Sequence, residues 1–294
     1  MKAIYDVPAP AKLNLFLHVV GKRPDGYHLL QSIFVLIDWA DTLHFERRDD
    51  GQLARHDSGN SLPPDDLCLR AARALQVQSG CTSGADIHIE KCLPAGAGMG
   101  GGSSDAASTL LALNRLWGLN WPLSRLLPLG LSLGADVPFF LGGRHAIVEG
   151  IGEILHPIHL PAQRFAVLKP AASIATAQIF SSPLLARSDF VAIVAGFPGP
   201  NKQGQFLDGF GHNDLQKPAE ALCPEVGQAL KILEQRFGNS RMTGSGSAVF
   251  ARVDLNVTGE ESTSPIWPQE LPANWVGKMC NSLDAHPLYG WAEN

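Results

Sequence analysis

The part of the sequence best suited to chemistry is the glycine-rich run PAGAGMGGGSSDAA, which begins at Pro94. It follows a segment of alternating polar and apolar residues, 85–91, and precedes an apolar segment that we expect to be helical. A glycine loop between a strand and a helix exposes backbone N–H groups at a helix N-terminus, which attracts anions. Because five glycines occupy the seven positions 96–102, the backbone can approach a phosphate group closely.

We call residues 94–104 the glycine loop and predict that they bind a di- or triphosphate. Its members are Pro94, Ala95, Gly96, Ala97, Gly98, Met99, Gly100, Gly101, Gly102, Ser103 and Ser104.

Other interpretations of the glycine loop fit the sequence less well. The spacing Gly96-x-Gly98-x-x-Gly101 matches the dinucleotide fingerprint, which would indicate an NAD(P)-dependent oxidoreductase. That fingerprint requires an acid about 20 residues further on, and positions 115–127 contain none. The Gly-Lys-Ser/Thr tripeptide of a P-loop is absent from the chain. A plain strand–helix turn needs one or two glycines, not five.

Two further segments contain candidate site residues. Asp136 stands in Gly-Ala-Asp-Val-Pro-Phe-Phe, where a carboxylate beside an apolar wall can accept a proton from a hydroxyl group. The alternative is a turn aspartate that caps its own backbone. The small-residue run MTGSGSAVF, residues 242–250, precedes a predicted strand, and a tight bend would explain it equally well.

Composition and charge exclude several classes of protein. The net charge is −5 and no run of Lys or Arg occurs, which argues against binding to nucleic acid or to a membrane surface. No apolar run reaches the roughly 18 residues of a membrane span, and the N-terminus lacks the pattern of a signal peptide. Five scattered cysteines indicate reduced thiols in a cytoplasmic protein.

The pattern of apolar residues predicts strands alternating with helices, and the length of 294 residues favours two domains with a boundary near residue 160. We expect strands at 11–20, 29–37, 42–47, 85–91 and 164–169, and helices at 65–79, 103–117, 122–133, 174–182 and 224–237. We expect a polar loop at 48–64, a turn followed by a strand at 134–148, and little regular structure at 183–222.

Taken together, the three small-residue segments resemble the GHMP kinases, small-molecule kinases named for galactose, homoserine, mevalonate and phosphomevalonate. Segments 9–15, 23–31, 134–140 and 212–215 resemble the branch of that family whose substrate is a methylerythritol carrying a cytidine diphosphate. The resemblance covers nearly the whole chain, and the combination of four motifs is highly specific. Only segment 183–211 has no recognisable counterpart.

The resemblance implies an α+β fold of two domains with the active site in the cleft between them. Residues 1–160 would form an N-terminal ATP-binding and catalytic domain like domain 2 of ribosomal protein S5. Residues 161–294 would form a ferredoxin-like C-terminal GHMP kinase domain. The implied activity is ATP-dependent phosphorylation of the 2-hydroxyl of the cytidyl substrate in the non-mevalonate isoprenoid pathway, with another small alcohol as the alternative substrate.

The resemblance also implies roles for particular residues. Asp136 would be the catalytic base and Lys12 its partner, although without the motif Lys12 would be taken for a surface lysine on a strand edge. ATP would bind to the glycine loop, with Mg²⁺ bridging its phosphates and no protein ligand for the metal identified. The residues implied to contact the substrate are Asn14, Tyr27, His28, Asp136, Thr176 and Phe180, with the cytosine beside Tyr27 and His28.

Overall fold

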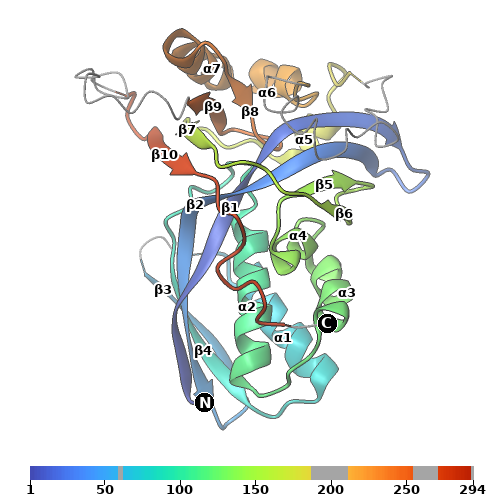
Figure 1. Cartoon of the computed structure of the whole chain (residues 1–294), viewed down its shortest axis with the longest axis vertical. Coiled ribbons are helices and arrows are strands. Elements are labelled where there is room, and N and C mark those ends of the chain that lie inside the picture. The colour runs from blue at the N-terminus through green and yellow to red at the C-terminus, as the bar shows by residue number, and fades with distance from the viewer. Residues whose placement is uncertain (59–61, 187–210, 254–270, 293–294) are drawn as a thin grey trace.

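The computed structural model describes residues 1–58, 62–186, 211–253 and 271–292. Two long antiparallel strands, β1 (Ala3–Lys22) and β2 (His28–Arg48), run through both halves of the molecule (Figure 1). The sequence predicted two separate strands at 29–37 and 42–47, but the structure has the single strand β2 over both ranges. The polar residues between them fit into a continuous strand because Asp38 accepts hydrogen bonds from Asn281, and Asp41 from the backbone of Cys92 and Leu93.

The first sheet has six strands in the order β3-β4-β2-β5-β6, with β1 paired to β2. Its other members are β3 (Leu53–Ser58), β4 (Gly84–Glu90), β5 (Ala146–Glu149) and β6 (Ile154–Pro157). The predicted loop at 48–64 is wrong in part, because β3 pairs in parallel with β4 along its full length. A polar edge strand of this kind lacks the apolar alternation by which strands are predicted.

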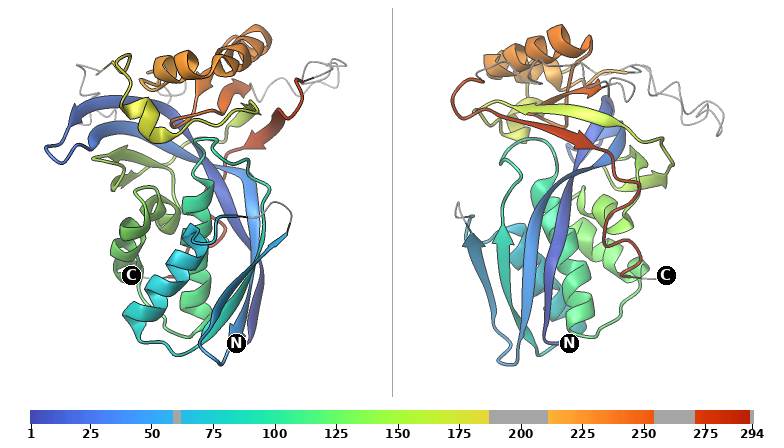
Figure 2. Two further views of the ribbon diagram at one scale, coloured as in Figure 1. Left: turned by 180° about the vertical axis from the view of Figure 1, so that it is seen from behind. Right: turned by 60° about the vertical axis from the view of Figure 1, so that its left-hand side comes forward.

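Four helices cover one face of this sheet, as the two views of Figure 2 show. They are α1 (Leu67–Ser79), α2 (Gly101–Leu116), α3 (Leu123–Leu133) and α4 (Val137–Gly142). The prediction of helix 65–79 is confirmed: Asp66 caps α1 through the backbone N–H groups of Cys68 and Leu69, and Gly80 ends it with φ 67°. The prediction of a turn leading straight to a strand at 134–148 missed α4, a helix of only six residues.

The second sheet has four strands in the order β10-β7-β9-β8. They are β7 (Arg164–Lys169), β8 (Arg241–Met242), β9 (Val249–Val253) and β10 (Val276–Asn281), and all neighbouring pairs are antiparallel. The helices α6 (Gln216–Leu222) and α7 (Pro224–Phe237) pack on one face, and the short helix α5 (Thr176–Phe180) follows β7 (Figure 1). Of the segment predicted to be irregular, 183–222, residues 187–210 lie outside the described residues and 216–222 form α6.

The side chains of β2 alternate between its two faces, and this alternation links the two halves of the protein. Phe34, Leu36 and Phe45 point into the core beneath the helices of the first sheet. Ile33 and Val35 point the other way, into a core shared with β7 and β9 of the second sheet. The β1–β2 pair therefore joins both sheets, and residues carried by it lie where the two halves meet.

The C-terminal segment returns to the first sheet. The N–H of Leu283 donates to the carbonyl of Leu36, and the N–H of His286 donates to the carbonyl of Gly143, directly after α4. Leu288 is buried in the first core.

Helices and largely antiparallel sheets together confirm the predicted α+β class, whereas a domain boundary near residue 160 stays a prediction. All five cysteines are free, and no helix among the described residues has the length and apolar character to cross a membrane.

Candidate active site

Lys12 lies in β1 and is only 3% exposed, so the alternative of a surface lysine is wrong. Its Nζ donates a hydrogen bond of 2.5 Å to Oδ1 of Asn14 and lies 3.7 Å from Oδ2 of Asp136. The same ammonium group lies 4.3 Å from the centre of the Phe34 ring, a cation–π distance. Burial lowers the pKa of Lys12, and the charge of Asp136 acts in the opposite direction. The site thus contains a fixed cation directed at Asp136.

Asp136 directly precedes α4, and its side chain is 30% exposed. The carboxylate makes no capping hydrogen bond to the helix, so the alternative of a turn aspartate that caps its own backbone does not hold. Pro138 in the first turn starts α4, and Phe139 and Phe140 are buried beneath it. Asp136 is therefore held by its backbone, while its carboxylate stays open to a hydroxyl group.

The glycine loop lies beside these two residues. The N–H of Lys12 donates to the carbonyl of Met99 over 3.0 Å. A Cβ atom on Gly100 would lie 2.9 Å from the Phe140 ring and 3.4 Å from Cε of Lys12, so only glycine fits at this contact. Gly100 also has φ 72°, the left-handed conformation that glycine adopts most easily. The loop, the lysine and the start of α4 are thus in direct contact.

The backbone N–H groups of the glycine loop are available to a ligand. From Ala95 to Ser103, none of them donates a hydrogen bond to another described residue. Those of Gly101, Gly102 and Ser103 begin α2, where a helix has no internal acceptors and carries partial positive charge. This arrangement suits an anion such as a phosphate group.

Ser104 differs from its neighbours in the glycine loop. It is fully buried, its Oγ donates to the carbonyl of Pro10 over 2.7 Å, and its N–H donates to Gly100. Both donors are therefore used within the protein, and Ser104 fastens α2 to β1. Ser103 is partly exposed at the same end of the loop.

A second loop closes against the first. The GSGS loop (residues 242–248) donates from Ser247 N–H to Gly96 and from Ala248 N–H to Ala97, over 3.0 and 3.2 Å. A Cβ atom on Gly98 would lie 2.4 Å from the carbonyl oxygen of Thr243, and Gly98 has φ 72°. The segment has a binding partner in the glycine loop, so it is more than a tight bend.

The motif at 212–215 supports the GSGS loop from behind. Nδ2 of Asn213 donates to the carbonyls of Met242 and Gly244, each over 2.8 Å. Oδ2 of Asp214 accepts from the N–H of Val19 in β1. Asp214 therefore has a structural role, and sequence reasoning missed the role of Asn213.

Asn14 lies among protein partners and is 1% exposed. Its Oδ1 accepts from Lys12 and from Oγ1 of Thr243, and its Nδ2 donates to Oγ of Ser32. Asn14 therefore lies beside Lys12, and most of its hydrogen-bonding capacity is used by protein groups. Sequence reasoning missed Ser32 and Thr243, whose hydroxyl groups carry no signature outside the fold.

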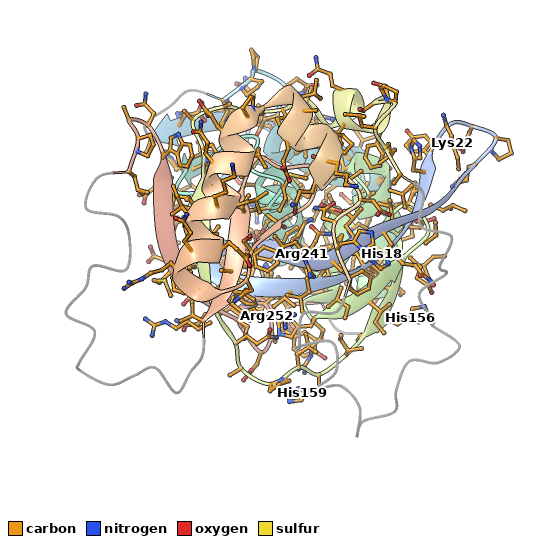
Figure 3. The ribbon with its side chains drawn as sticks, turned by 90° about the horizontal axis from the view of Figure 1, so that it is seen from above. His18, Lys22, His156, His159, Arg241 and Arg252 are labelled. Atoms are coloured by element: carbon orange, nitrogen blue, oxygen red, sulfur yellow. The ribbon has the colours of Figure 1, made fainter. Side chains whose placement is uncertain are left out.

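The remaining predicted residues gather at the tip of the β1–β2 pair and at α5. The rings of His28 and Phe180 stack with 5.0 Å between centroids and 19° between planes. Thr176 shares a hydrogen bond of 2.7 Å with Ser245 of the GSGS loop. Tyr27 is 60% exposed and makes no ring contact with another described residue. Seen from above, Lys22 marks the projecting end of β1, while His18 and Arg241 lie nearer the middle of the molecule (Figure 3).

Known proteins resemble this chain in sequence. Residues 66–144 match the GHMP kinases N terminal domain, and residues 200–260 match the GHMP kinases C terminal domain. Over 293 residues, 99% of either chain, the sequence is 62% identical to the 4-diphosphocytidyl-2-C-methyl-D-erythritol kinase of Methylibium petroleiphilum. The chain belongs to the GHMP kinase family. A second 4-diphosphocytidyl-2-C-methyl-D-erythritol kinase, from Variovorax paradoxus, is 56% identical to this GHMP kinase over 306 residues, covering 99% of this chain and 100% of its own.

Solved structures agree with the family. A 4-(cytidine 5'-diphospho)-2C-methyl-D-erythritol kinase is 35% identical and has a TM-score of 0.72, covering 84% of this GHMP kinase and 89% of its own chain. The homoserine kinase of Cytophaga hutchinsonii is 16% identical, has a TM-score of 0.70 and covers 97% and 96% of the two chains, which shows a common fold. The predicted family, its two-domain fold and the enzyme class are confirmed.

Proposed function

We propose that this kinase transfers the γ-phosphoryl group of ATP to the 2-hydroxyl of 4-diphosphocytidyl-2-C-methyl-D-erythritol, in the non-mevalonate isoprenoid pathway. The observation that carries the proposal is the pair of Lys12 and Asp136, 3.7 Å apart, beside a glycine loop in which the N–H groups of residues 95–103 donate to no other described residue. The substrate is supported by the names of relatives that are 62% and 56% identical over 99% of the chain.

In the proposed reaction, Asp136 accepts the proton of the 2-hydroxyl group. The hydroxyl oxygen forms a bond to the γ-phosphorus, the bond from that phosphorus to the bridging oxygen breaks, and ADP leaves with the electron pair. Lys12 stabilises the negative charge on the phosphoryl group in transit. Because the transition state of phosphoryl transfer is loose, this positioning matters more than the basicity of Asp136.

ATP binds in this proposal with its phosphates against the N–H groups of residues 95–103. Mg²⁺ would enter with the nucleotide and would neutralise part of the charge of its phosphates. Among the described residues no group of three His, Cys, Asp or Glu side chains could hold a metal. Of the two serines, Ser103 is the better phosphate donor, since both donors of Ser104 are used internally.

The cytosine binds in this proposal at the tip of the β1–β2 pair. His28 and Phe180 bring this tip and α5 together, and the exposed ring of Tyr27 is free to stack on a base. His28 can bond to the edge of the cytosine once its ring separates from Phe180. Asn14 and Thr176 face the methylerythritol part of the substrate in this proposal. Asn14 would bond to it through the amide hydrogen that its protein partners leave unused.

A panel of acceptor alcohols, assayed by ATP-dependent ADP release, tests the proposal. We expect turnover with the cytidyl substrate and none with homoserine, mevalonate or galactose. Turnover with one of these and not with the cytidyl compound would favour the alternative of another small alcohol. An NAD(P)-dependent oxidoreductase finds no support, because α2 leads into the helices α3 and α4 rather than into a parallel strand that ends in an acid.

A further inference from the structure

Three charged side chains that take no part in the proposed reaction form a buried cluster at the ends of the glycine loop. Lys91 precedes the loop by three residues and Asp105 follows it directly, while Asp41 comes from β2. Nζ of Lys91 donates to Oδ2 of Asp41 and, over 2.6 Å, to Oδ2 of Asp105. Asp41 is 0% and Asp105 is 2% exposed, so these contacts are shielded from water. One ammonium group thus ties both ends of the loop to the sheet.

Asp41 also holds the backbone that enters the loop. Its Oδ1 accepts hydrogen bonds from the N–H groups of Cys92 and Leu93, over 2.6 and 2.7 Å. At the other end, a Cβ atom on Gly101 would lie 3.8 Å from Oδ2 of Asp41. The side chain of Asp41 therefore contacts the approach to the loop and lies close to the first residue of α2.

The charges of this cluster do not balance if both carboxyl groups are ionised. Two carboxylates would face one ammonium group in a buried place, which favours a proton on one of them. Two backbone N–H groups donate to Oδ1 of Asp41. Asp105 is the better acid, because its Oδ1 has no hydrogen-bond partner among the described residues. Burial raises the pKa of Asp105 to about 8, with Lys91 opposing and Asp41 reinforcing the change.

We propose that Asp41, Lys91 and Asp105 are positioning residues for ATP, and that Asp105 is protonated when the glycine loop is in its ATP-binding conformation. This inference rests on the proposed role of the glycine loop. Ionisation of Asp105 adds a negative charge close to the helix N-terminus that receives the phosphates, and it draws Lys91 away from Asp41. Both effects weaken the binding of ATP.

Few other titratable groups near Asp105 could cause this change in ATP binding. Among the described residues, Cys68 of α1 also interacts with Asp105. Burial raises the pKa of Cys68 well above its ordinary value, which keeps this thiol neutral. β1 faces α2 with the neutral carbonyl groups of Pro8 and Pro10, and α4 contains only neutral residues.

The dissociation constant of a non-hydrolysable ATP analogue with Mg²⁺, measured by calorimetry at pH 7 and pH 9, tests the inference. For the unaltered enzyme we expect weaker binding at pH 9, by on the order of tenfold. Asp105→Asn imitates the protonated acid, so the ratio between the two pH values is expected to stay within about twofold. Asp49→Asn, whose side chain is 92% exposed, is the matched control and is expected to keep the ratio of the unaltered enzyme. Equal ratios for the unaltered enzyme and Asp105→Asn would overturn the inference.

Two further measurements separate the possible failures. If the analogue does not bind the unaltered enzyme at either pH, the proposed role of the glycine loop fails, not only the role of the cluster. If Asp105→Asn does not fold, carbon-13 NMR of the aspartate carboxyl groups in the unaltered enzyme replaces it. A buried carboxyl that titrates above pH 7 and responds to Lys91→Met supports the inference, and the absence of any such carboxyl contradicts it.

Discussion

Lys12 and Asp136 face each other with 3.7 Å between Nζ and Oδ2, yet the shorter bond of Lys12, 2.5 Å, goes to the neutral amide oxygen of Asn14. The lysine is therefore held in place without a close ion pair to the aspartate. This leaves the carboxylate of Asp136 able to accept a proton, and it keeps the ammonium group available to a phosphoryl oxygen. The predictions below depend on this arrangement.

Replacement of Lys12 by methionine removes the charge and keeps most of the buried chain. We expect kcat to fall by about 10²–10³-fold, the usual loss for one fixed donor to a transition state. The KM values for both substrates are expected to change little, because the charge acts on the group in transit. Steady-state kinetics check this, with Lys231→Met on the exposed face of α7 as the control. A large rise in KM with unchanged kcat would contradict a role in the chemical step.

The pH dependence of kcat reports the protonation of Lys12. Because burial lowers the pKa of Lys12, we expect kcat at saturating substrates to fall with rising pH at a value below the ordinary lysine pKa of about 10.4. In Asn14→Asp a carboxylate replaces the amide that bonds to Lys12, and its negative charge raises the pKa of Lys12 again. The alkaline decline is therefore expected at higher pH in Asn14→Asp, and a decline at the same pH in both enzymes would show that it does not come from Lys12.

Phe180→Ala removes the ring that stacks on His28, at the tip of the β1–β2 pair where we propose that the cytosine binds. Stacking on a base contributes about 1–3 kcal/mol, so we expect the KM for the cytidyl substrate to rise by roughly 5- to 150-fold. The KM for ATP is expected to stay unchanged, because we place ATP at the glycine loop and not at this ring pair. Equal effects on both KM values would indicate that Phe180 supports the fold instead.

Asn213→Ala removes the two hydrogen bonds that support the GSGS loop. We expect a loss of about 1–3 kcal/mol in the free energy of unfolding and a higher KM for ATP, because this loop holds the glycine loop. Denaturant unfolding and steady-state kinetics measure the two effects. Asn239→Ala is the matched control, since Nδ2 of Asn239 also donates to two carbonyls but is exposed, and neither carbonyl belongs to the GSGS loop.

His286 links the C-terminal segment to the residue after α4. Burial lowers its pKa to about 4, and its Nε2 has no hydrogen-bond partner among the described residues. The unfolded chain binds this proton near pH 6.5, so stability is expected to decrease as the pH falls from about 6.5 to 4. His286→Asn keeps an acceptor for the N–H of Leu288 and does not titrate. Its melting temperature should therefore fall less over this pH range, and an equal fall would contradict the prediction.

Much of the fold could be predicted because it follows from local patterns. The amphipathic helix 224–237 and the strand 164–169 have the predicted bounds, since their apolar residues recur with the period of the element. The strand β3 and the helix α4 could not be predicted in this way. β3 is stabilised by pairing with β4, and α4 by the burial of Phe139 and Phe140, and both effects come from the fold rather than from local sequence.

The candidate site, too, could be predicted only in part from the sequence. Motifs pointed to Lys12 and Asp136, which lie more than a hundred residues apart in the chain and meet in the structure. No motif could show that the Ser104 hydroxyl bonds to Pro10, or that Ser32 and Thr243 surround Asn14. These contacts depend on the register between β1 and β2 and on the approach of the second sheet, which only tertiary structure determines.

The single-turnover rate of Asp136→Asn at saturating MgATP and cytidyl substrate tests the central claim most directly. Asparagine has nearly the same shape but cannot accept the proton, so we expect the rate to fall by about 10²–10⁴-fold while both dissociation constants stay close to those of the unaltered enzyme. A rate equal to that of the unaltered enzyme would show that Asp136 is not the proton acceptor.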